Sequence, residues 1–343
     1  MEFGTGDIPT MNQGRRVSGC HVSESSSRTE LLRDDAGVAG LGDGAEEALI
    51  ASCWTTAGEA SPLDEDQRSP VPFARRVALA SDVGFTGFGI THADILYLSE
   101  TIGLDECRDI IVESGIQFVE LEMLMDWFTT GSSRESSDRM RDDLLRASAT
   151  LPVRHIKVGS TYGSIDWPMS GIAQELRLLS SQAADVGVQI ALEPQAMASI
   201  RSPQDAIEAV ERADHPAAGL LLDIWHIERI RLPMDAIREI PGEIIIATEL
   251  SDAPAHVEGS LLEDTVNGRL LCGEGSFHVA AFVDAVRATG YRGPWGAEIL
   301  SKAHRARPVE DAIRAAYETT RRAVEGPAPM EQGSTFARDW EKP

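Results

Sequence analysis

The sequence has few cysteines, no long apolar run and no apolar segment at its start. Its 343 residues include four scattered cysteines, Cys20, Cys53, Cys107 and Cys272, with no Cys-x-x-Cys pair. A disulfide framework is not expected in so long a chain, and a reducing cytosol is the simpler environment. No apolar run approaches the roughly 20 residues that cross a bilayer. The N-terminus lacks the apolar core of a signal peptide, so we expect a cytoplasmic protein that is not bound to a membrane.

Basic residues are also scarce. There are 31 Lys and Arg against 55 Asp and Glu, which gives a formal net charge of -24. A partner with a phosphate backbone is recognised by clustered Lys and Arg, so no nucleic-acid partner is expected. The charge suits a protein that handles neutral or cation-assisted ligands, although better solubility alone also explains it. Hydrophobic residues make up 42% of the chain, enough to build a sizeable core.

The two ends of the sequence differ in character from its middle. Residues 1–47 are rich in Gly, Ser, Asp, Glu and Arg without sustained periodicity, and we expect a disordered N-terminal arm there. Residues 325–343 are polar and contain proline, and we expect a short C-terminal tail. Residues 48–324 alternate between short apolar runs and helical patterns, which predicts one domain.

Eight strand-then-helix units are expected in this domain. The expected strands are residues 48–54, 85–91, 116–122, 153–158, 188–193, 218–223, 243–249 and 295–300. The expected helices are residues 70–83, 100–114, 136–149, 171–186, 203–213, 232–240, 279–289 and 308–324. Eight such units in about 275 residues match a (β/α)₈ TIM barrel. A doubly wound open sheet is the competing fold, but the first strand–helix junction lacks a G-x-G-x-x-G turn.

Acids stand at the C-terminal ends of four consecutive expected strands, at Glu193, Asp223, Glu249 and Glu298. Each follows an apolar run, so each is expected to enter the mouth of the barrel. Carboxylates this close repel one another, and a divalent cation is the usual compensation. Oxygen ligands favour a hard ion such as Mn²⁺ or Mg²⁺. For any one acid alone, capping of the following helix is the simpler interpretation.

Five motifs resemble the xylose-isomerase-like TIM-barrel superfamily, which includes sugar phosphate isomerases and epimerases. They are ALEP (191–194), LLDIWH (221–226), ELSD (249–252), RLLCGEG (269–275) and GPWGAEIL (293–300), and the resemblance covers residues from about 48 to 324. The resemblance implies that Glu193, Asp223, Glu249 and Glu298 are the metal ligands. The family pattern usually has a histidine where this chain has Glu249. That departure could shift the metal preference, with Co²⁺ or Zn²⁺ as alternatives, or move ligation to Asp252 or His226.

The resemblance also implies a mechanism. Glu193 and Glu298 would act as the acid–base pair, one removing a proton beside a ketone and the other returning or relaying it. The metal would hold the ketone and adjacent hydroxyl oxygens and stabilise the enediolate. His226 and Arg269 match positions that bind substrate oxygens in the family. A planar guanidinium suits that role, although Arg269 could instead form a salt bridge within a loop.

Other strand ends supply secondary candidates for substrate binding. His92 follows the second expected strand, Glu122 ends the third, and His155 and Lys157 share one face of the fourth. Lys157 could bind a carboxylate or phosphate or assist an elimination, or it could form a structural ion pair with Glu122 or Glu193.

Several functions follow from these expectations. The leading hypothesis is a metal-dependent isomerase or epimerase of a small keto-sugar or keto-polyol. The same enediolate can expel a β-hydroxyl, so the alternative is a lyase of the 3-dehydroshikimate or inosose dehydratase type, or one that cleaves 3-keto C-glycosides. A non-catalytic sugar-binding subunit is a third reading. A metal-dependent endonuclease is disfavoured by the acidic charge, and a homodimer is one expected assembly because such barrels often pair through their outer helices.

Overall fold

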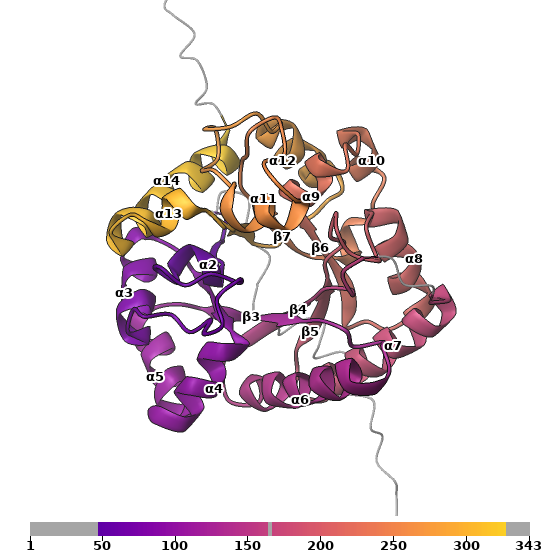
Figure 1. The fold of residues 1–343 in the computed structure, drawn as a ribbon, viewed down its shortest axis with the longest axis horizontal. Coiled ribbons are helices and arrows are strands. Elements are labelled where there is room, and N and C mark those ends of the chain that lie inside the picture. Colours follow the sequence, from indigo (N-terminus) through magenta and orange to yellow (C-terminus); the bar gives the residue numbers. More distant parts are fainter. Residues whose placement is uncertain (1–46, 164–166, 327–343) are drawn as a thin grey trace, which may run out of the picture. The chain divides into compact units, whose positions relative to one another are not determined.

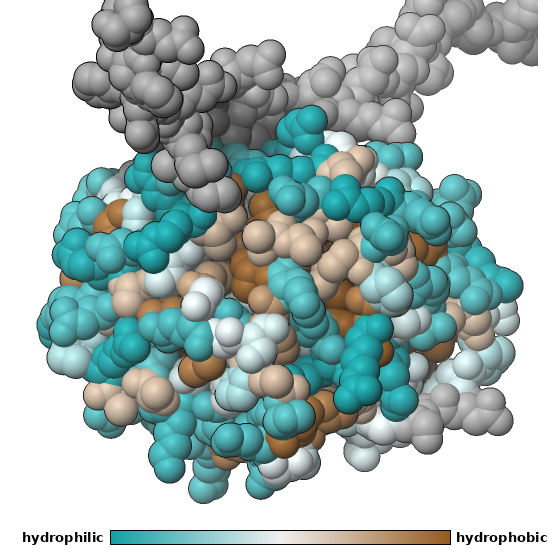
Figure 2. Space-filling model, turned by 90° about the horizontal axis from the view of Figure 1, so that it is seen from above, coloured by the Kyte–Doolittle hydropathy of each residue, from teal (hydrophilic) through white to brown (hydrophobic). Residues whose placement is uncertain are grey.

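The computed structural model describes residues 47–163 and 167–326 (Figure 1). The arm predicted for residues 1–47 and the tail predicted for residues 325–343 lie outside the described residues, except for Glu47, Glu325 and Gly326. Among the described residues, no helix is long and apolar enough to span a bilayer. In the face shown by Figure 2, hydrophilic side chains cover most of the described surface and hydrophobic ones form scattered patches.

Eight parallel strands close into a barrel in sequence order, and helices surround them (Figure 1). The strands are β1 (Leu49–Ala51), β2 (Gly87–Thr91), β3 (Phe118–Leu124), β4 (Val153–Val158), β5 (Gln189–Leu192), β6 (Ala218–Asp223), β7 (Ile245–Leu250) and β8 (Trp295–Ala297). The barrel closes where β1 pairs with β8, with Leu49 opposite Trp295 and Ala51 opposite Ala297. The predicted (β/α)₈ TIM barrel is therefore confirmed, and the open sheet is excluded.

The helices include several short ones that the sequence patterns do not predict. They are α2 (Cys53–Thr56), α3 (Phe73–Val83), α4 (His92–Thr101), α5 (Leu104–Ser114), α6 (Gly131–Ser148), α7 (Met169–Asp185), α8 (Pro203–Ala213), α9 (Ile224–Arg229), α10 (Met234–Arg238), α11 (Leu261–Asn267), α12 (Val279–Ala288), α13 (Lys302–Arg305) and α14 (Val309–Glu325), with the 3₁₀ turn η1 (Gly242–Ile244) before β7. The prediction of one strand over residues 48–54 was wrong at its end, because Trp54 lies in α2. A single helix over residues 100–114 was also wrong, because α4 ends at Thr101 and α5 begins at Leu104.

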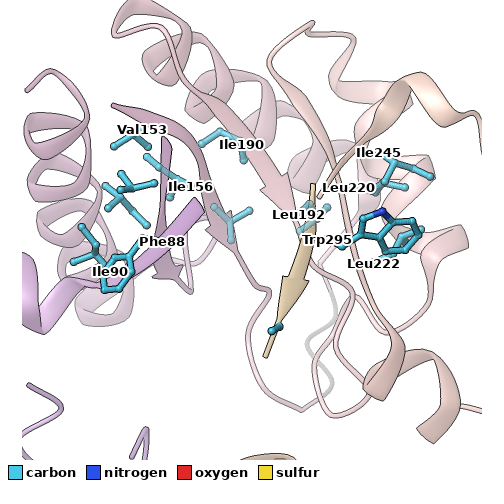
Figure 3. Packing of buried hydrophobic residues seen from close by; sticks show 14 of the residues in the cluster. Phe88, Ile90, Val153, Ile156, Ile190, Leu192, Leu220, Leu222, Ile245 and Trp295 are labelled. Carbon is cyan, nitrogen blue, oxygen red and sulfur yellow. The ribbon is translucent and has the colours of Figure 1, made fainter. Parts of the chain in front are cut away.

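Side chains alternate between two layers of the barrel. Leu220 and Leu222 of β6 point outward into the large core between strands and helices, together with residues such as Ile190, Leu192 and Trp295 (Figure 3). A smaller cluster contains Ala191, Leu221, Ile246 and Ala247. Because successive strand residues face opposite sides, the residues two positions after Ala191, Leu221 and Ala247 share the faces of those three residues. Those residues are Glu193, Asp223 and Glu249, so the apolar pattern of the strands directs three acids into the barrel mouth.

Candidate metal centre

The four acids at the ends of β5 to β8 meet in one place. Ligand oxygens of Glu193, Asp223, Glu249 and Glu298 all lie within 4.8 Å of one another, and all four residues are buried. In the register of the sheet, Asp223 lies opposite Glu249, and Glu249 lies opposite Gly296. A Cβ at Gly296 would lie 2.9 Å from Cγ of Glu249, so the glycine leaves the space that this glutamate occupies.

One oxygen of a carboxylate is often fixed by the protein while the other stays available. Glu193 accepts a hydrogen bond at Oε2 from Gln195 Nε2 (2.9 Å). Asp223 accepts one at Oδ1 from the backbone N–H of Trp225 (2.8 Å). Glu249 Oε2 is buried without a hydrogen-bond partner among the described residues, whereas Asp223 Oδ2 lies 2.8 Å from Arg269 Nη1. Unsatisfied buried anionic oxygens are costly, and a divalent ion would satisfy them. The residues present therefore fit a metal ion bound by oxygen ligands.

Two buried cations contact the same carboxylates. Lys157 Nζ lies 2.8 Å from Glu122 Oε2, 2.6 Å from Glu249 Oε1 and 2.8 Å from Glu298 Oε1. Arg269 Nη1 lies 2.8 Å from Asp223 Oδ2 and 3.0 Å from Glu298 Oε2. Glu298 is thus contacted by both cations, whereas Glu249 is contacted by the lysine.

The pKa values of these acids diverge according to those contacts. Burial would raise the pKa of Glu298, but Lys157 and Arg269 outweigh it and lower the pKa to about 2. Burial and the charge of Glu298 raise the pKa of Glu249 well above its ordinary value, with Lys157 opposing them. Burial also raises the pKa of Asp223 against the opposing charge of Arg269. Without a metal, the cluster therefore holds carboxyls that resist ionisation.

His226 lies beside this cluster at the start of α9. Its Nε2 is 3.4 Å from Glu193 Oε1 and 3.8 Å from Asp223 Oδ2. The backbone N–H of Ala196 donates to its Nδ1 (3.2 Å), which places the proton of the neutral ring on Nε2. Glu193, Asp223 and His226 also form a second group with metal-ligand spacing.

A cavity of about 350 Å³ opens above the acids. Its lining includes Glu193, Glu298, His226 and Arg269, which belong to the cluster just described. Apolar side chains also line it, including Trp54, Met123, Met125, Met140, Met197, Leu262 and Val266. Such a cavity can hold a small molecule with its polar atoms on the acids and its remaining surface against apolar side chains.

Comparison with known proteins identifies the fold family. Residues 77–322 match the family model described as xylose isomerase-like TIM barrel. The chain belongs to this family. The resemblance seen in the motifs is therefore confirmed, and the family match includes all four acids of the cluster.

Individual members of the xylose isomerase-like family show similarity over part of their length. A 3-dehydroshikimate dehydratase of Pseudomonas putida is 28% identical over 271 residues, which are 74% of this chain and 41% of that protein. An inosose isomerase of Bacillus velezensis is 24% identical over 156 residues, which are 44% of this chain and 54% of that protein. The IolI protein, solved with a bound zinc atom, shares the fold with a TM-score of 0.70 at 19% identity, covering 81% of this chain and 98% of that one.

The structure places the candidate residues of this xylose isomerase-like chain in two layers. His226, Arg269, Glu122 and His92 line the cavity. His92 Nε2 also lies 3.0 Å from Asp143 Oδ2. The second layer holds the remaining two candidates, His155 and Lys157, which are fully buried.

Lys157 and His155 lie deeper in the barrel and, within the described part of the chain, do not line the cavity. His155 is fully buried, and its Nε2 lies 3.1 Å from Glu120 Oε2. Burial lowers the pKa of His155 in spite of that partner. The ion pair between Lys157 and Glu122, one of the two alternatives for this lysine, is present.

Asp252, the other residue to which metal ligation could move, has a different set of partners. Its carboxylate accepts hydrogen bonds from the backbone N–H groups of Ala253, Gly273 and Phe277, and so it organises the loop after β7.

Sequence reasoning missed two residues of the centre. Gln195 fixes Glu193, and its position two residues further along the chain was the available signal. The Ser52 hydroxyl lies within hydrogen-bond distance of Glu249 Oε1 (3.2 Å) and of Glu122 and Glu298 (3.4 Å each). Nothing in the local sequence distinguishes this serine, because its partners come from distant strands.

Proposed function

We propose that the chain is a divalent-metal-dependent enzyme that removes a proton beside the ketone of a small polyhydroxy ketone and expels a β-hydroxyl as water. The observation that carries the proposal is the convergence of four buried carboxylates. Two of them, Glu193 and Glu298, line the cavity, and Glu249 Oε2 has no hydrogen-bond partner among the described residues. Relatives supply the reaction class, because the match to a 3-dehydroshikimate dehydratase extends over 74% of this chain.

Glu193, Asp223, Glu249 and Glu298 are the residues that would hold the metal. When bound, the metal would supply a Lewis acid that favours negative charge on the ketone oxygen. The remaining tasks fall to side chains that line the cavity. Arg269 presents a planar cation fixed by Asp223 and Glu298, and it can bind a substrate oxygen at the cavity floor.

The proton-transfer groups are Glu193 and Glu298. Glu193 lines the cavity and is oriented by Gln195, so it is placed to take the proton from the carbon beside the ketone. In a dehydration, that proton leaves with the expelled hydroxyl as water, and a carbon–carbon double bond forms. The Nε2–H of His226 points to the same region and can donate a hydrogen bond to the departing oxygen.

Isomerisation or epimerisation is the second candidate, and it shares the first step. Its support is the inosose isomerase relative and the second cavity-lining carboxylate, Glu298, which could return a proton in place of the elimination. The two outcomes differ in product. Dehydration of 3-dehydroshikimate gives an aromatic acid, whereas isomerisation of a keto-polyol leaves no new conjugation.

The test uses the Mn²⁺-loaded protein with 3-dehydroshikimate and with an inosose, followed by ultraviolet absorbance and by exchange of the proton beside the ketone in deuterated water. We expect absorbance of an aromatic product from the first substrate. Glu193→Gln should lower both the exchange and the product rate by about 100-fold or more, the range for a lost acid–base group.

The matched control is Glu175→Gln, which removes a carboxylate of a partly exposed ion pair with Arg134 outside the cavity. It should leave both rates unchanged. Exchange with no ultraviolet product would favour isomerisation, and full exchange in both Glu193→Gln and Glu298→Gln would exclude the proposed mechanism. Absence of exchange in the wild-type protein with every ketone tried would favour a non-catalytic sugar-binding subunit.

A further inference from the structure

The buried lysine of β4 has no assigned task in the proposed reaction. Lys157 is fully buried, and its ammonium lies against three carboxylates from three other strands or strand ends, those of Glu122, Glu249 and Glu298. Within the described residues it does not line the cavity, so a substrate there would meet other side chains first. A role in direct substrate binding therefore has no geometric support, and its contacts point to the carboxylates instead.

Lys157 distinguishes the two oxygens of each metal-ligand glutamate that it contacts. Its Nζ donates to Oε1 of Glu249 (2.6 Å) and to Oε1 of Glu298 (2.8 Å). The Ser52 hydroxyl shares these same Oε1 atoms, at 3.2 and 3.4 Å. Oε2 of Glu249 is left buried without a hydrogen-bond partner among the described residues. Lys157 and Ser52 thus hold the Oε1 side of each carboxylate. Oε2 of Glu249 is left for the metal, whereas Oε2 of Glu298 lies 3.0 Å from Arg269 Nη1.

Lys157 also supplies the counter-charge in direct contact with Glu249. Arg269 pairs with Asp223 and Glu298. Among the described ion pairs, Glu249 pairs with Lys157 alone. An ammonium carries three donors and no acceptor, which matches three carboxylate oxygens around one nitrogen. A buried carboxylate without a counter-charge is strongly unfavourable, so the position of Glu249 depends on this lysine.

We propose that Lys157 is a positioning residue of the metal centre, a cation built into the barrel that holds Glu249 and Glu298 by their Oε1 atoms so that Oε2 of Glu249 is presented to the metal. The inference rests on the metal centre of the proposed function and adds a residue outside the ligand set. Partners that orient metal ligands typically contribute about 10- to 100-fold to metal affinity.

The experiment is a double-mutant cycle with Lys157→Met, Glu249→Gln and the combined variant. Methionine fills a similar volume without charge, and glutamine keeps an oxygen without charge. Two readouts are needed: the dissociation constant for Mn²⁺ by calorimetry, and the midpoint of thermal unfolding in the presence of a chelator. We expect Lys157→Met to weaken Mn²⁺ binding about tenfold or more. We also expect Lys157→Met to lower the unfolding midpoint. In the combined variant, the added Glu249→Gln change should recover at least half of that loss.

The matched control is Arg76→Met, which breaks the buried ion pair between Arg76 and Asp94 (2.6 Å) away from the four acids. It should lower the unfolding midpoint while leaving the Mn²⁺ dissociation constant unchanged. A space-filling role for Lys157 predicts the same behaviour as this control. Unchanged or tighter Mn²⁺ binding in Lys157→Met, or additive effects on the midpoint, would overturn the inference. A wild-type protein that binds no divalent ion would instead overturn the proposed function itself.

Discussion

Two glutamates of the same cluster illustrate how neighbouring charges decide the behaviour of a residue. Glu298 contacts both Lys157 and Arg269, and its pKa falls to about 2. Glu249 contacts Lys157 but also lies near the negative charge of Glu298, and its pKa rises well above the ordinary range. Both side chains are buried, so burial does not explain why their pKa values differ. The difference lies in which cation reaches which oxygen.

The four acids could be predicted from the sequence because each follows an apolar strand. The alternation of side chains along β5, β6 and β7 places Glu193, Asp223 and Glu249 on the inner face. The partners of Lys157 could not be predicted as a set. An ion pair with Glu122, on the adjacent expected strand, could be proposed from the sequence. The contacts with Glu249 and Glu298 could not, because they form only when the barrel brings distant strands together.

A buried histidine away from the cluster gives a prediction about pH. His304 lies at the rim of the barrel, where its Nε2 hydrogen-bonds with the carbonyl of Thr55 (3.0 Å) and its Nδ1 has no partner among the described residues. Burial lowers the pKa of His304, with the Thr55 contact opposing it. The folded state therefore holds a neutral ring, while the unfolded chain takes up a proton below about pH 6.5.

The lowered pKa of His304 in the folded state makes the stability of the protein depend on pH. Stability contributed by neutral His304 is present above the unfolded pKa and is lost as the pH falls from there toward the folded pKa. We expect His304→Gln to be less stable than wild type at about pH 8, and the gap to narrow toward about pH 5, by about 1.4 kcal/mol per unit of pKa lowering. Chemical denaturation at both pH values measures it. A gap that stays constant or widens on acidification would contradict the assignment.

At the scale of elements, the buried strands and most of the longer helices could be predicted, whereas α4 and the short helices α2, α9, α11 and α13 could not. The bounds of β4, β6 and α8 agree with the sequence pattern. α8 begins with a capping box between Ser202 and Asp205 and has Pro203 in its first turn, so its start is visible in the sequence. α11 lies between the seventh expected strand and the expected helix 279–289, and its seven residues are too few to show periodicity.

Asp223 links an element to the metal centre, because the carboxylate that would bind the metal also caps a helix. Its Oδ1 accepts the backbone N–H of Trp225 at the start of α9, while its Oδ2 faces the cluster. Asparagine keeps the capping oxygen and removes the charge, whereas alanine removes both. We expect both variants to lose metal binding, and Asp223→Ala to unfold with about 1 kcal/mol less free energy than Asp223→Asn in a chelator. Equal stabilities of the two variants would show that Asp223 does not support α9.

At the scale of the whole molecule, the count of eight strand–helix units predicted the barrel. The sequence patterns did not show which strand ends approach one another across the mouth, because those distances depend on the pairing of β1 with β8. Substrate choice is also not visible from strand patterns, because the methionines that line the cavity come from β3, α6 and the loops after β3 and β5. The chain spans 41% of the length of its dehydratase relative, so the activity of that whole protein is a proposal for this one.

The central claim is that the ends of β5 to β8 form one divalent-metal site, and metal content tests it most directly. The purified wild-type protein and a Glu193→Gln/Asp223→Asn double variant would be analysed for bound metal, then unfolded thermally with and without added Mn²⁺ or Mg²⁺. We predict a near-stoichiometric divalent ion in the wild type and none in the variant. Added metal at about 100 times its dissociation constant should stabilise only the wild type, by about 2.7 kcal/mol. A wild-type protein without bound metal, whose unfolding does not respond to either ion, would contradict the account.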